Sequence, residues 1–410
     1  MLRSLLLAGI AWTLAGCAPM LPEPRLASNR PVPGPVEFDG IDSLLANDRP
    51  LDVLLVHGMC SKDAAWAQQA LADMAALVQA STQTPVVHTP LGAGGIELFQ
   101  TTLETARGRV RANAVLWSPL TRPLKQGLCY DQSHKSAICT APPLPEPAPA
   151  YAHPRASLNR QLKDELLNDC LADALAYQGT ARQAITARMQ EAVLTALDRS
   201  GGQPQASAAG MPARLAERQE PLVVITSSLG SKMVFDALLG LAASGDGARS
   251  RAAQNSYDRI ATVFMRANQI PILALADTDL PAPAGAPVPL AQPSSRGTTP
   301  DPIAALEQRR QRPPPAPAGA GMKPAGVGAP GRLQLVAFTD PNDVLSYVLV
   351  PSPMAQAAPY RIVDVVLSTA PALLGLVASP IAAHQDYDTN TQVRRFIACG
   401  TAAACGLQAP

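Results

Sequence analysis

"PLVVITSSLGSKMVFDALL", residues 221–239, changes from one periodicity to another within a few positions. Residues 222–225 form a continuous β-branched and apolar run, which is typical of a strand buried on both faces of a parallel sheet. From Met233 onward, apolar residues recur at helical spacing. Only residues 226–231 lie between the two patterns. The sequence therefore predicts a buried strand that turns sharply into a helix, with a small hydroxyl residue at the tip of the corner.

The same alternation of strands and helices continues along the chain. Helical spacing is found at 63–78 and across most of 158–197. Strand-like apolar runs lie within 51–58, 85–89, 112–123, 259–275, 332–343 and 360–368. Strands that alternate with helices over this length predict an α/β fold with a doubly wound, mostly parallel sheet.

The corner at residues 226–230, TSSLG, has the small-x-nucleophile-x-small form of a nucleophile elbow. Small residues flank the nucleophile because the helix passes close to the strand. With Ser228 as the nucleophile, the first small position holds Thr226, which is bulkier than the usual glycine. Ser227 is the competing nucleophile, but it would place Leu229 where a small residue is needed. The alternative reading is a serine-rich loop without chemistry.

A general base is expected downstream of such a serine. His384 is the only histidine that follows Ser228 in the chain. Its surroundings resemble the histidine loop of lipase- and esterase-like α/β-hydrolases, in which the histidine precedes a tyrosine, an asparagine and an apolar helix. Tyr387 and Asn390 occupy those places here. The resemblance to this superfamily spans about residues 51–397 and implies the order serine, acid, histidine.

The acid is expected between these two residues, after a strand. AFTDPNDVLSY, residues 337–347, offers Asp340 and Asp343. A carboxylate at this place orients the imidazole and stabilises its cationic form. Asp343 is favoured because apolar residues follow it, as in the family. Asp340 remains the alternative, and either aspartate can serve only the turn.

VHGM, residues 56–59, ends an early strand where α/β-hydrolases place the loop that supplies an oxyanion-hole amide. The resemblance implies that the N–H groups of Met59 and Leu229 form that hole. His57 by itself is more often a structural histidine at a strand end.

The N-terminus carries an export signal. A basic start at Arg3 precedes a short apolar run that ends in LAGC, residues 14–17. This ending resembles the processing box of bacterial lipoproteins, in which the cysteine, here Cys17, receives the lipid. The resemblance implies an anchor in the cell envelope, with the outer membrane facing the periplasm favoured; an ordinary secretory signal is the alternative.

Six further cysteines remain, and an even number in an exported chain indicates disulfides. Cys129 with Cys139, and Cys399 with Cys405, are close in sequence. Cys60 with Cys170 is left by elimination, although many other pairings are open. No Cys-x-x-Cys or His-x-x-x-His spacing indicates a metal site, and we expect no cofactor.

The predicted organisation is a signal peptide at 1–16, a Pro-rich membrane tether at 17–48, and an α/β-hydrolase core at 49–278 and 332–400. Residues 279–331 are rich in Pro, Ala and Gly, have no apolar period, and are expected to be a disordered or cap-like insertion. Residues 370–380 between the last strand and His384 are apolar enough to line an acyl pocket or to be plain core.

The expected function is hydrolysis of a carboxylic ester, with an acyl-ester or lipid-like small molecule as substrate, by Ser228, His384 and Asp343. A net charge of +1 and an aromatic content of 4% argue against a nucleic-acid partner. The alternatives are an inactive envelope lipoprotein of the same fold that binds or scaffolds, and an acyltransferase. Thr226, and Ser231 in place of a common glycine, favour the inactive form.

Overall fold

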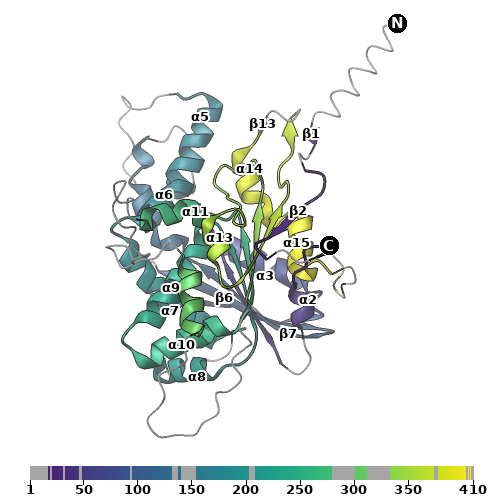
Figure 1. The fold of residues 1–410 in the computed structure, drawn as a ribbon. Helices are drawn as coiled ribbons and strands as arrows, with labels where there is room; N and C mark the ends of the chain where they lie inside the picture. The colour runs from purple at the N-terminus through teal and green to yellow at the C-terminus, as the bar shows by residue number, and fades with distance from the viewer. Residues whose placement is uncertain are drawn as a thin grey trace, which may run out of the picture.

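The central feature of the structure is a ten-stranded, mostly parallel sheet with helices on both faces (Figure 1). The prediction of an α/β architecture with a mostly parallel sheet is confirmed. The computed structural model describes residues 17–18, 21–30, 33–45, 49–92, 95–131, 137–139, 154–202, 208–278, 301–311, 333–373, 377–402, 405 and 407.

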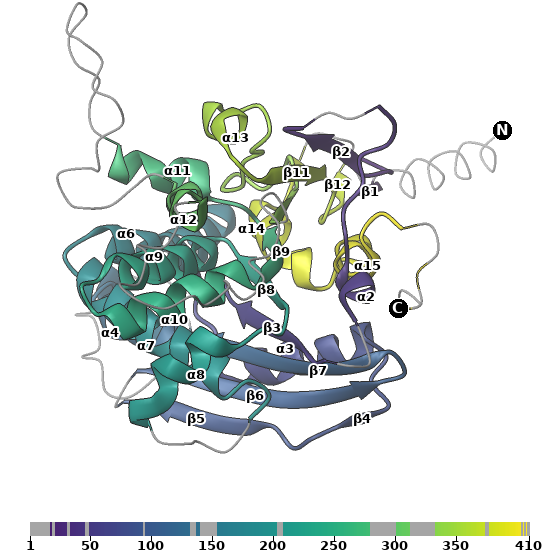
Figure 2. The same ribbon diagram turned by 60° about the horizontal axis from the view of Figure 1, so that its bottom comes forward.

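The sheet has the strand order β2-β11-β10-β9-β8-β3-β7-β6-β4, and β5 also pairs with β6. The six strands from β11 to β7 run parallel, whereas β2, β4, β5 and β6 pair antiparallel with their neighbours. Figure 2 shows the long β6 and β7 side by side at the antiparallel end. The strands are β2 (Arg25–Ser28), β3 (Leu51–Val56), β4 (Thr82–Gln83), β5 (Val87–Leu91), β6 (Ile96–Thr105), β7 (Gly108–Leu116), β8 (Leu222–Ser227), β9 (Ile260–Arg266), β10 (Gln334–Thr339) and β11 (Arg361–Val366).

Two layers of helices cover the sheet. In Figure 1, α7, α9 and α10 lie on one side, and α3 and α15 lie on the other. The longer helices are α3 (Ala64–Leu77), α6 (Ala172–Gln178), α7 (Arg182–Asp198), α8 (Met211–Glu217), α9 (Leu229–Ala243), α10 (Gly247–Asp258), α12 (Pro302–Gln311) and α15 (Thr391–Cys399). Shorter helices are α2 (Ile41–Leu44), α4 (Arg122–Gln126), α5 (Ser157–Gln161), α11 (Ile270–Ala274), α13 (Pro353–Ala357) and α14 (Pro380–Gln385), and a π-helix, η5, covers Leu162–Leu171.

The apolar run of β8 explains why the sheet is covered twice. Val224 belongs to the core under α7, α9 and α10, whereas Val223 and Ile225 belong to the core under α3 and α15. Alternate residues of a strand point to opposite faces, so a strand without polar residues has to be buried on both. The parallel strands also bring their carboxyl ends to one edge, where the loops after β3, β8, β9 and β10 meet.

The described residues between 21 and 45 pack against the core, which differs from the expected tether. β2 pairs antiparallel with β11, from Ser28 opposite Val363 to Arg25 opposite Val366. Phe38 and Ile41 are buried in the core under α15. A strand added to the edge of a sheet satisfies backbone groups that would otherwise be exposed, so this segment is held against the sheet. The short segments described between 21 and 45 therefore belong to the fold.

The predicted signal peptide, residues 1–16, lies outside the described residues. Cys17–Ala18 forms a short strand, β1, which pairs antiparallel with β12 (Ala372–Leu373), and β12 pairs with β13 (Val377–Ala378). Two short strands from the apolar segment 370–380 thus belong to a small second sheet. Within the part of the chain that the structure describes, no helix is both long enough and apolar enough to span a bilayer.

Within the Pro/Ala/Gly-rich segment 279–331, the structure describes residues 301–311, and Pro302–Gln311 form a helix that packs in the core and is therefore not disordered. In α12, Ile303 and Leu306 are fully buried, and the helix lies against α9. Asp301 accepts a hydrogen bond from the Ala304 N–H (2.9 Å) and so caps the first turn. The apolar face of α12 is only about one turn long and lies within a Pro-rich stretch, so the sequence pattern does not reveal it. Residues 279–300 and 312–332 lie outside the described residues.

The burial of α12 predicts a clear effect on stability. Leu306→Ala should lower the free energy of unfolding by about 2–4 kcal/mol, because it leaves a cavity against α9. Gln308→Ala, at an exposed position of the same helix, should change it by less than about 0.5 kcal/mol. Urea unfolding of both variants measures this difference, and equal effects would mean that the helix is not part of the cooperative core.

Candidate active site

Ser228 stands at the corner between β8 and α9, as the sequence predicts. Its backbone has φ 51° and ψ −129°, a left-handed conformation that costs free energy for any residue except glycine. The Ser228 N–H donates to the Arg266 carbonyl oxygen at the end of β9 (2.8 Å). This bond holds the corner against the neighbouring strand, so the serine lies beyond the sheet at its carboxyl edge.

The corner leaves no room for side chains at two glycines. A Cβ on Gly58 would lie 2.6 Å from the Ser228 Cβ, and a Cβ on Gly230 would lie 2.3 Å from the His57 carbonyl oxygen. The loop after β3 and the start of α9 therefore pass each other at backbone distance. This is the close approach for which the flanking small residues of an elbow are required.

Thr226 and Ser231, the two departures from the elbow pattern, lie against each other. Thr226 Oγ1 and Ser231 Oγ are 2.7 Å apart and hydrogen-bonded, and both residues are fully buried. The Thr226 side chain, which is larger than the usual glycine, thus packs against the Ser231 hydroxyl on the first turn of α9. The two departures from the elbow pattern therefore form one interacting pair.

This pair predicts a non-additive effect on stability. Thr226→Val and Ser231→Ala should each cost about 1–3 kcal/mol, because each leaves one buried hydroxyl without its partner. The double variant should cost less than the sum of the two. A double-mutant cycle by urea unfolding measures the coupling; strictly additive losses would contradict it.

His384 and Asp343 are hydrogen-bonded to each other. His384 Nδ1 lies 2.9 Å from Asp343 Oδ1 and 3.0 Å from Oδ2. The Tyr387 hydroxyl donates to Asp343 Oδ2 (3.1 Å), and burial raises the pKa of this tyrosine well above its ordinary value, so it stays a donor. With Nδ1–H donated to the carboxylate, the Nε2 lone pair of His384 is free to accept a proton.

Asp340, the competing acid, has a different role. Its carboxylate accepts bonds from the Asn342 N–H (2.7 Å), the Thr369 N–H (2.5 Å) and the Thr369 hydroxyl (2.8 Å). Thr369 also contacts α14, the helix that carries His384: its hydroxyl lies within hydrogen-bond distance of the Ala383 carbonyl oxygen (2.8 Å). Asp340 therefore ties the loop after β10 to the segment after β11, while Asp343 contacts the imidazole.

His57 is a structural residue that orients the candidate oxyanion loop. Its Nε2 accepts from the N–H groups of Trp117 (3.0 Å) and Ser118 (3.2 Å), so Nδ1 carries the proton and donates to the Gly58 carbonyl oxygen (2.7 Å). Burial lowers the pKa of His57 to about 3 and keeps it neutral. In a trans peptide the C=O and N–H point in opposite directions, so the Met59 N–H points away from the His57 ring.

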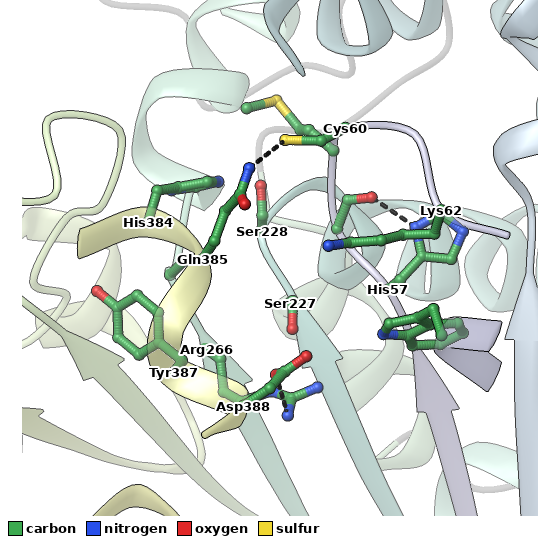
Figure 3. A pocket seen from close by; sticks show the side chains of 14 residues that line it. His57, Cys60, Lys62, Ser227, Ser228, Arg266, His384, Gln385, Tyr387 and Asp388 are labelled. Atoms are coloured by element: carbon green, nitrogen blue, oxygen red, sulfur yellow. Dashed lines mark hydrogen bonds and ion pairs between the residues drawn. The ribbon is translucent and has the colours of Figure 1, made fainter. Parts of the chain in front are cut away.

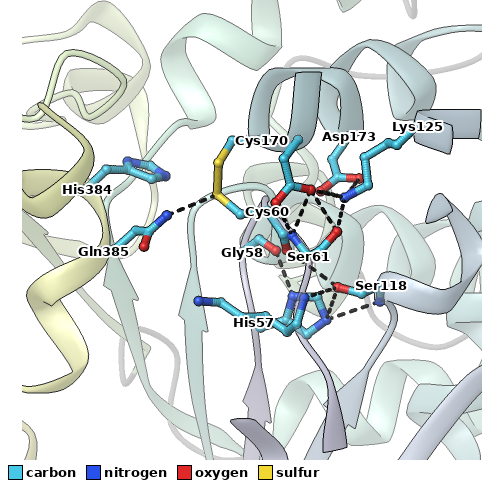
Figure 4. Close-up of a disulfide and its surroundings, with 12 residues drawn as sticks. His57, Gly58, Cys60, Ser61, Ser118, Lys125, Cys170, Asp173, His384 and Gln385 are labelled. Atoms are coloured by element: carbon cyan, nitrogen blue, oxygen red, sulfur yellow. Dashed lines mark hydrogen bonds and ion pairs between the residues drawn. A yellow bond between two sulfur atoms is a disulfide. The ribbon is translucent and has the colours of Figure 1, made fainter. Parts of the chain in front are cut away.

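A disulfide and a buried lysine brace the same loop (Figure 4). Cys60 is joined to Cys170 on η5. Lys125, which is fully buried, donates to the Ser61 hydroxyl (2.9 Å) and to Asp169 (2.7 Å). The Ser61 N–H also donates to the Asp169 carboxylate (3.1 Å). The residues that follow Met59 are thus fixed from two helical segments far away in the sequence.

All three preferred cysteine pairs are joined in the structure: Cys60–Cys170, Cys129–Cys139 and Cys399–Cys405. The Cys60–Cys170 disulfide lies beside the candidate site. Its two cysteines are 110 residues apart in the sequence, so the sequence does not indicate this location.

These segments enclose one small pocket (Figure 3). Backbone strain is concentrated here: of the four non-glycine residues with positive φ among those described, Cys60, Ser228 and Ala267 line it. Such strain is characteristic of functional sites. The residues that line the pocket are His57, Gly58, Met59, Cys60, Lys62, Trp66, Ser227, Ser228, Arg266, Ala267, His384, Gln385, Tyr387 and Asp388.

The pocket brings together residues from distant parts of the sequence. Ser228 and His384 both line it, and Figure 3 shows the imidazole directed towards Ser228. The Ser228 Oγ is buried and makes no hydrogen bond to any described residue. Leu229 is the first residue of α9, where an N–H has no acceptor within the helix. The expected serine, base, acid and both amide donors thus belong to one edge of the sheet.

Sequence reasoning missed the charged residues of this pocket. Lys62, Arg266 and Asp388 line it, although no motif marks them. Their contribution depends on how the loops after β3, β9 and β11 meet, which no local pattern encodes. The search against protein-family models, the search of curated proteins and the search of solved structures each found no match, so a functional assignment rests on the geometry of this pocket.

Proposed function

We propose that this protein is a serine hydrolase of the α/β-hydrolase fold that cleaves carboxylic esters. One observation carries the proposal: an unpartnered serine hydroxyl at a strained corner shares a pocket with a histidine whose other nitrogen is held by a carboxylate. A structural serine gains nothing from a left-handed backbone or from a buried hydroxyl without a partner.

The roles follow from the contacts. Ser228 Oγ attacks the ester carbonyl carbon while its proton passes to His384 Nε2, and the carbonyl π electrons move to oxygen. The Met59 and Leu229 N–H groups stabilise that oxyanion. When the C–O bond to the alcohol breaks, His384 returns the proton to the leaving oxygen. Water then repeats the sequence on the acyl-serine and releases the acid.

Asp343 and Tyr387 serve this sequence indirectly. The Asp343 carboxylate keeps the imidazole in the tautomer that accepts at Nε2 and stabilises the imidazolium that forms. Tyr387 donates to the second carboxylate oxygen and accepts the Asp340 N–H (2.6 Å), so it fixes Asp343 relative to the loop after β10.

A panel of p-nitrophenyl esters with acyl chains of graded length tests the proposal. The purified protein should release nitrophenol with saturation kinetics, fastest for short chains because the pocket is small. A folded protein that turns over none of these esters would support the inactive binding lipoprotein instead. Addition of small alcohols distinguishes acyl transfer, since a transferase would form the new ester in preference to the acid.

We further propose that Cys17 carries a lipid that anchors the chain to the bacterial envelope; the motive is the LAGC box after a short apolar run. Expressed in a bacterium, the protein should incorporate labelled fatty acid and partition into detergent. Cys17→Ser should abolish both, whereas Cys405→Ser, which breaks a distant disulfide, should leave them unchanged. Labelling that persists in Cys17→Ser would contradict the anchor.

A further inference from the structure

Two cationic side chains line the pocket beside Ser228. Lys62 comes from the loop after β3, and Arg266 is the last residue of β9. Figure 3 shows the ammonium end of Lys62 directed into the space in front of Ser227 and Ser228. A pocket for a neutral acyl chain has no need for such groups, because burying a charge without a partner is unfavourable.

The backbone of Lys62 is fixed by hydrogen bonds, and its ammonium group has no ion-pair partner in the described part of the chain. Its N–H donates to the Ser118 hydroxyl (2.8 Å), and its neighbour Ser61 is bound by Asp169. Among the residues that the structure describes, no carboxylate lies within ion-pair distance of its ammonium group. The backbone of Lys62 is therefore fixed, while its ammonium group remains available for a bound anion.

Arg266 has one carboxylate partner and one donor nitrogen without a partner among the described residues. One guanidinium nitrogen pairs with Asp388, which also lines the pocket, whereas its Nε is buried without a hydrogen-bond partner. Its side chain is 11% exposed, so its orientation is fixed by packing and by the ion pair. Counting Lys62 and Arg266 as +1 each and Asp388 as −1, with the histidines neutral, the lining carries a net charge of +1.

We propose that this pocket selects esters that carry a carboxylate near the scissile carbonyl, and that Lys62 and Arg266 bind this carboxylate. The inference rests on the hydrolase proposed above and names its substrate class. One carboxylate balances the net charge of the lining and is compact enough for a small pocket. An anion bound beside the corner also holds the carbonyl near Ser228, which lowers the entropic cost of the attack.

Matched esters test the proposal. Mono-p-nitrophenyl succinate places a carboxylate on the acyl side, p-carboxyphenyl butyrate places it on the alcohol side, and p-nitrophenyl and phenyl butyrate are the neutral counterparts. For one of the two pairs, kcat/KM should be about tenfold higher for the anionic ester, the ratio expected for one hydrogen-bonded charge pair. Added salt should reduce the ratio, because it screens the interaction.

Variants assign the preference to the pocket. Lys62→Met should bring the ratio close to unity, and Lys62→Glu should reverse it. Lys163→Met is the matched control: Lys163 lies on η5, pairs with Asp131 (2.6 Å), and should leave both esters and their ratio unchanged. Thermal unfolding establishes that each variant is folded.

The outcomes separate this inference from the hydrolase proposal. Equal kcat/KM values for the anionic and neutral members of both pairs, in a protein that hydrolyses them, overturn the inference alone. A preference that persists in Lys62→Met and Lys62→Glu overturns the assignment to these residues. Failure to hydrolyse any of the esters, together with failure to react with a fluorophosphonate, overturns the hydrolase and the inference with it.

Discussion

Ser228→Ala should abolish covalent labelling by a fluorophosphonate probe and lower ester turnover by about a thousandfold or more. A serine hydroxyl is unreactive unless a base and an oxyanion hole act on it together. In the wild type, His384 faces the pocket, and Ser228 Oγ has no competing hydrogen-bond partner among the described residues. The labelled peptide, identified by mass spectrometry, should contain Ser228.

Two further variants define the origin of that reactivity. His384→Ala should lose labelling as well, because the base is gone while the serine is intact. Ser227→Ala is the matched control, since Ser227 lies next to Ser228, ends β8 opposite Arg266, and should keep at least part of the labelling. A well-folded wild type that stays unlabelled would favour the scaffold protein, and labelling that survives Ser228→Ala would place the nucleophile elsewhere.

The parts of the site that the sequence predicts are those encoded locally. The strand-corner-helix at 221–239 needs only an apolar run, small residues and a helical repeat, and β8, Ser228 and α9 follow it. His384 could be selected because no other histidine follows the corner. Asn390 caps α15 by accepting from the Gln392 and Val393 N–H groups, a role that its position before the helix indicates.

Other features depend on contacts between distant segments and leave little trace in the sequence. The sequence does not predict β6, because residues 96–105 mix polar with apolar side chains, yet the strand pairs with β7 from Glu97 to Thr105. The sequence does not distinguish β2 from a tether, because a short edge strand carries almost no apolar signal. The compensation between Thr226 and Ser231 became visible only when the corner brought their hydroxyls together.

The two aspartates after β10 show the same limit, because Asp340 and Asp343 share one turn and differ only in their tertiary contacts. Asp343 accepts from His384 Nδ1 (2.9 Å), the Tyr387 hydroxyl (3.1 Å) and the Leu345 N–H (3.0 Å). Asp340 accepts instead from Asn342 and Thr369. An aspartate-to-asparagine change should therefore reduce ester turnover far more at Asp343 than at Asp340.

Asp343→Asn should lower kcat/KM for esters by about a thousandfold to ten-thousandfold in the folded fraction of the protein. The amide keeps the shape of the side chain, but its NH₂ group can donate to Nδ1 and so favours the tautomer with the proton on Nε2. That proton blocks the nitrogen that has to accept from Ser228. The pocket keeps its geometry and loses its base.

Asp340→Asn should lower the free energy of unfolding by about 1–3 kcal/mol, since an amide has one acceptor oxygen, whereas both oxygens of Asp340 accept hydrogen bonds, one from the Asn342 N–H and the other from Thr369. Its folded fraction should retain kcat/KM within about tenfold of the wild type, because its carboxylate does not contact His384. Ester kinetics and urea unfolding, measured on both variants, separate these effects. A large loss of turnover in Asp340→Asn with an active Asp343→Asn would exchange the roles of the two residues.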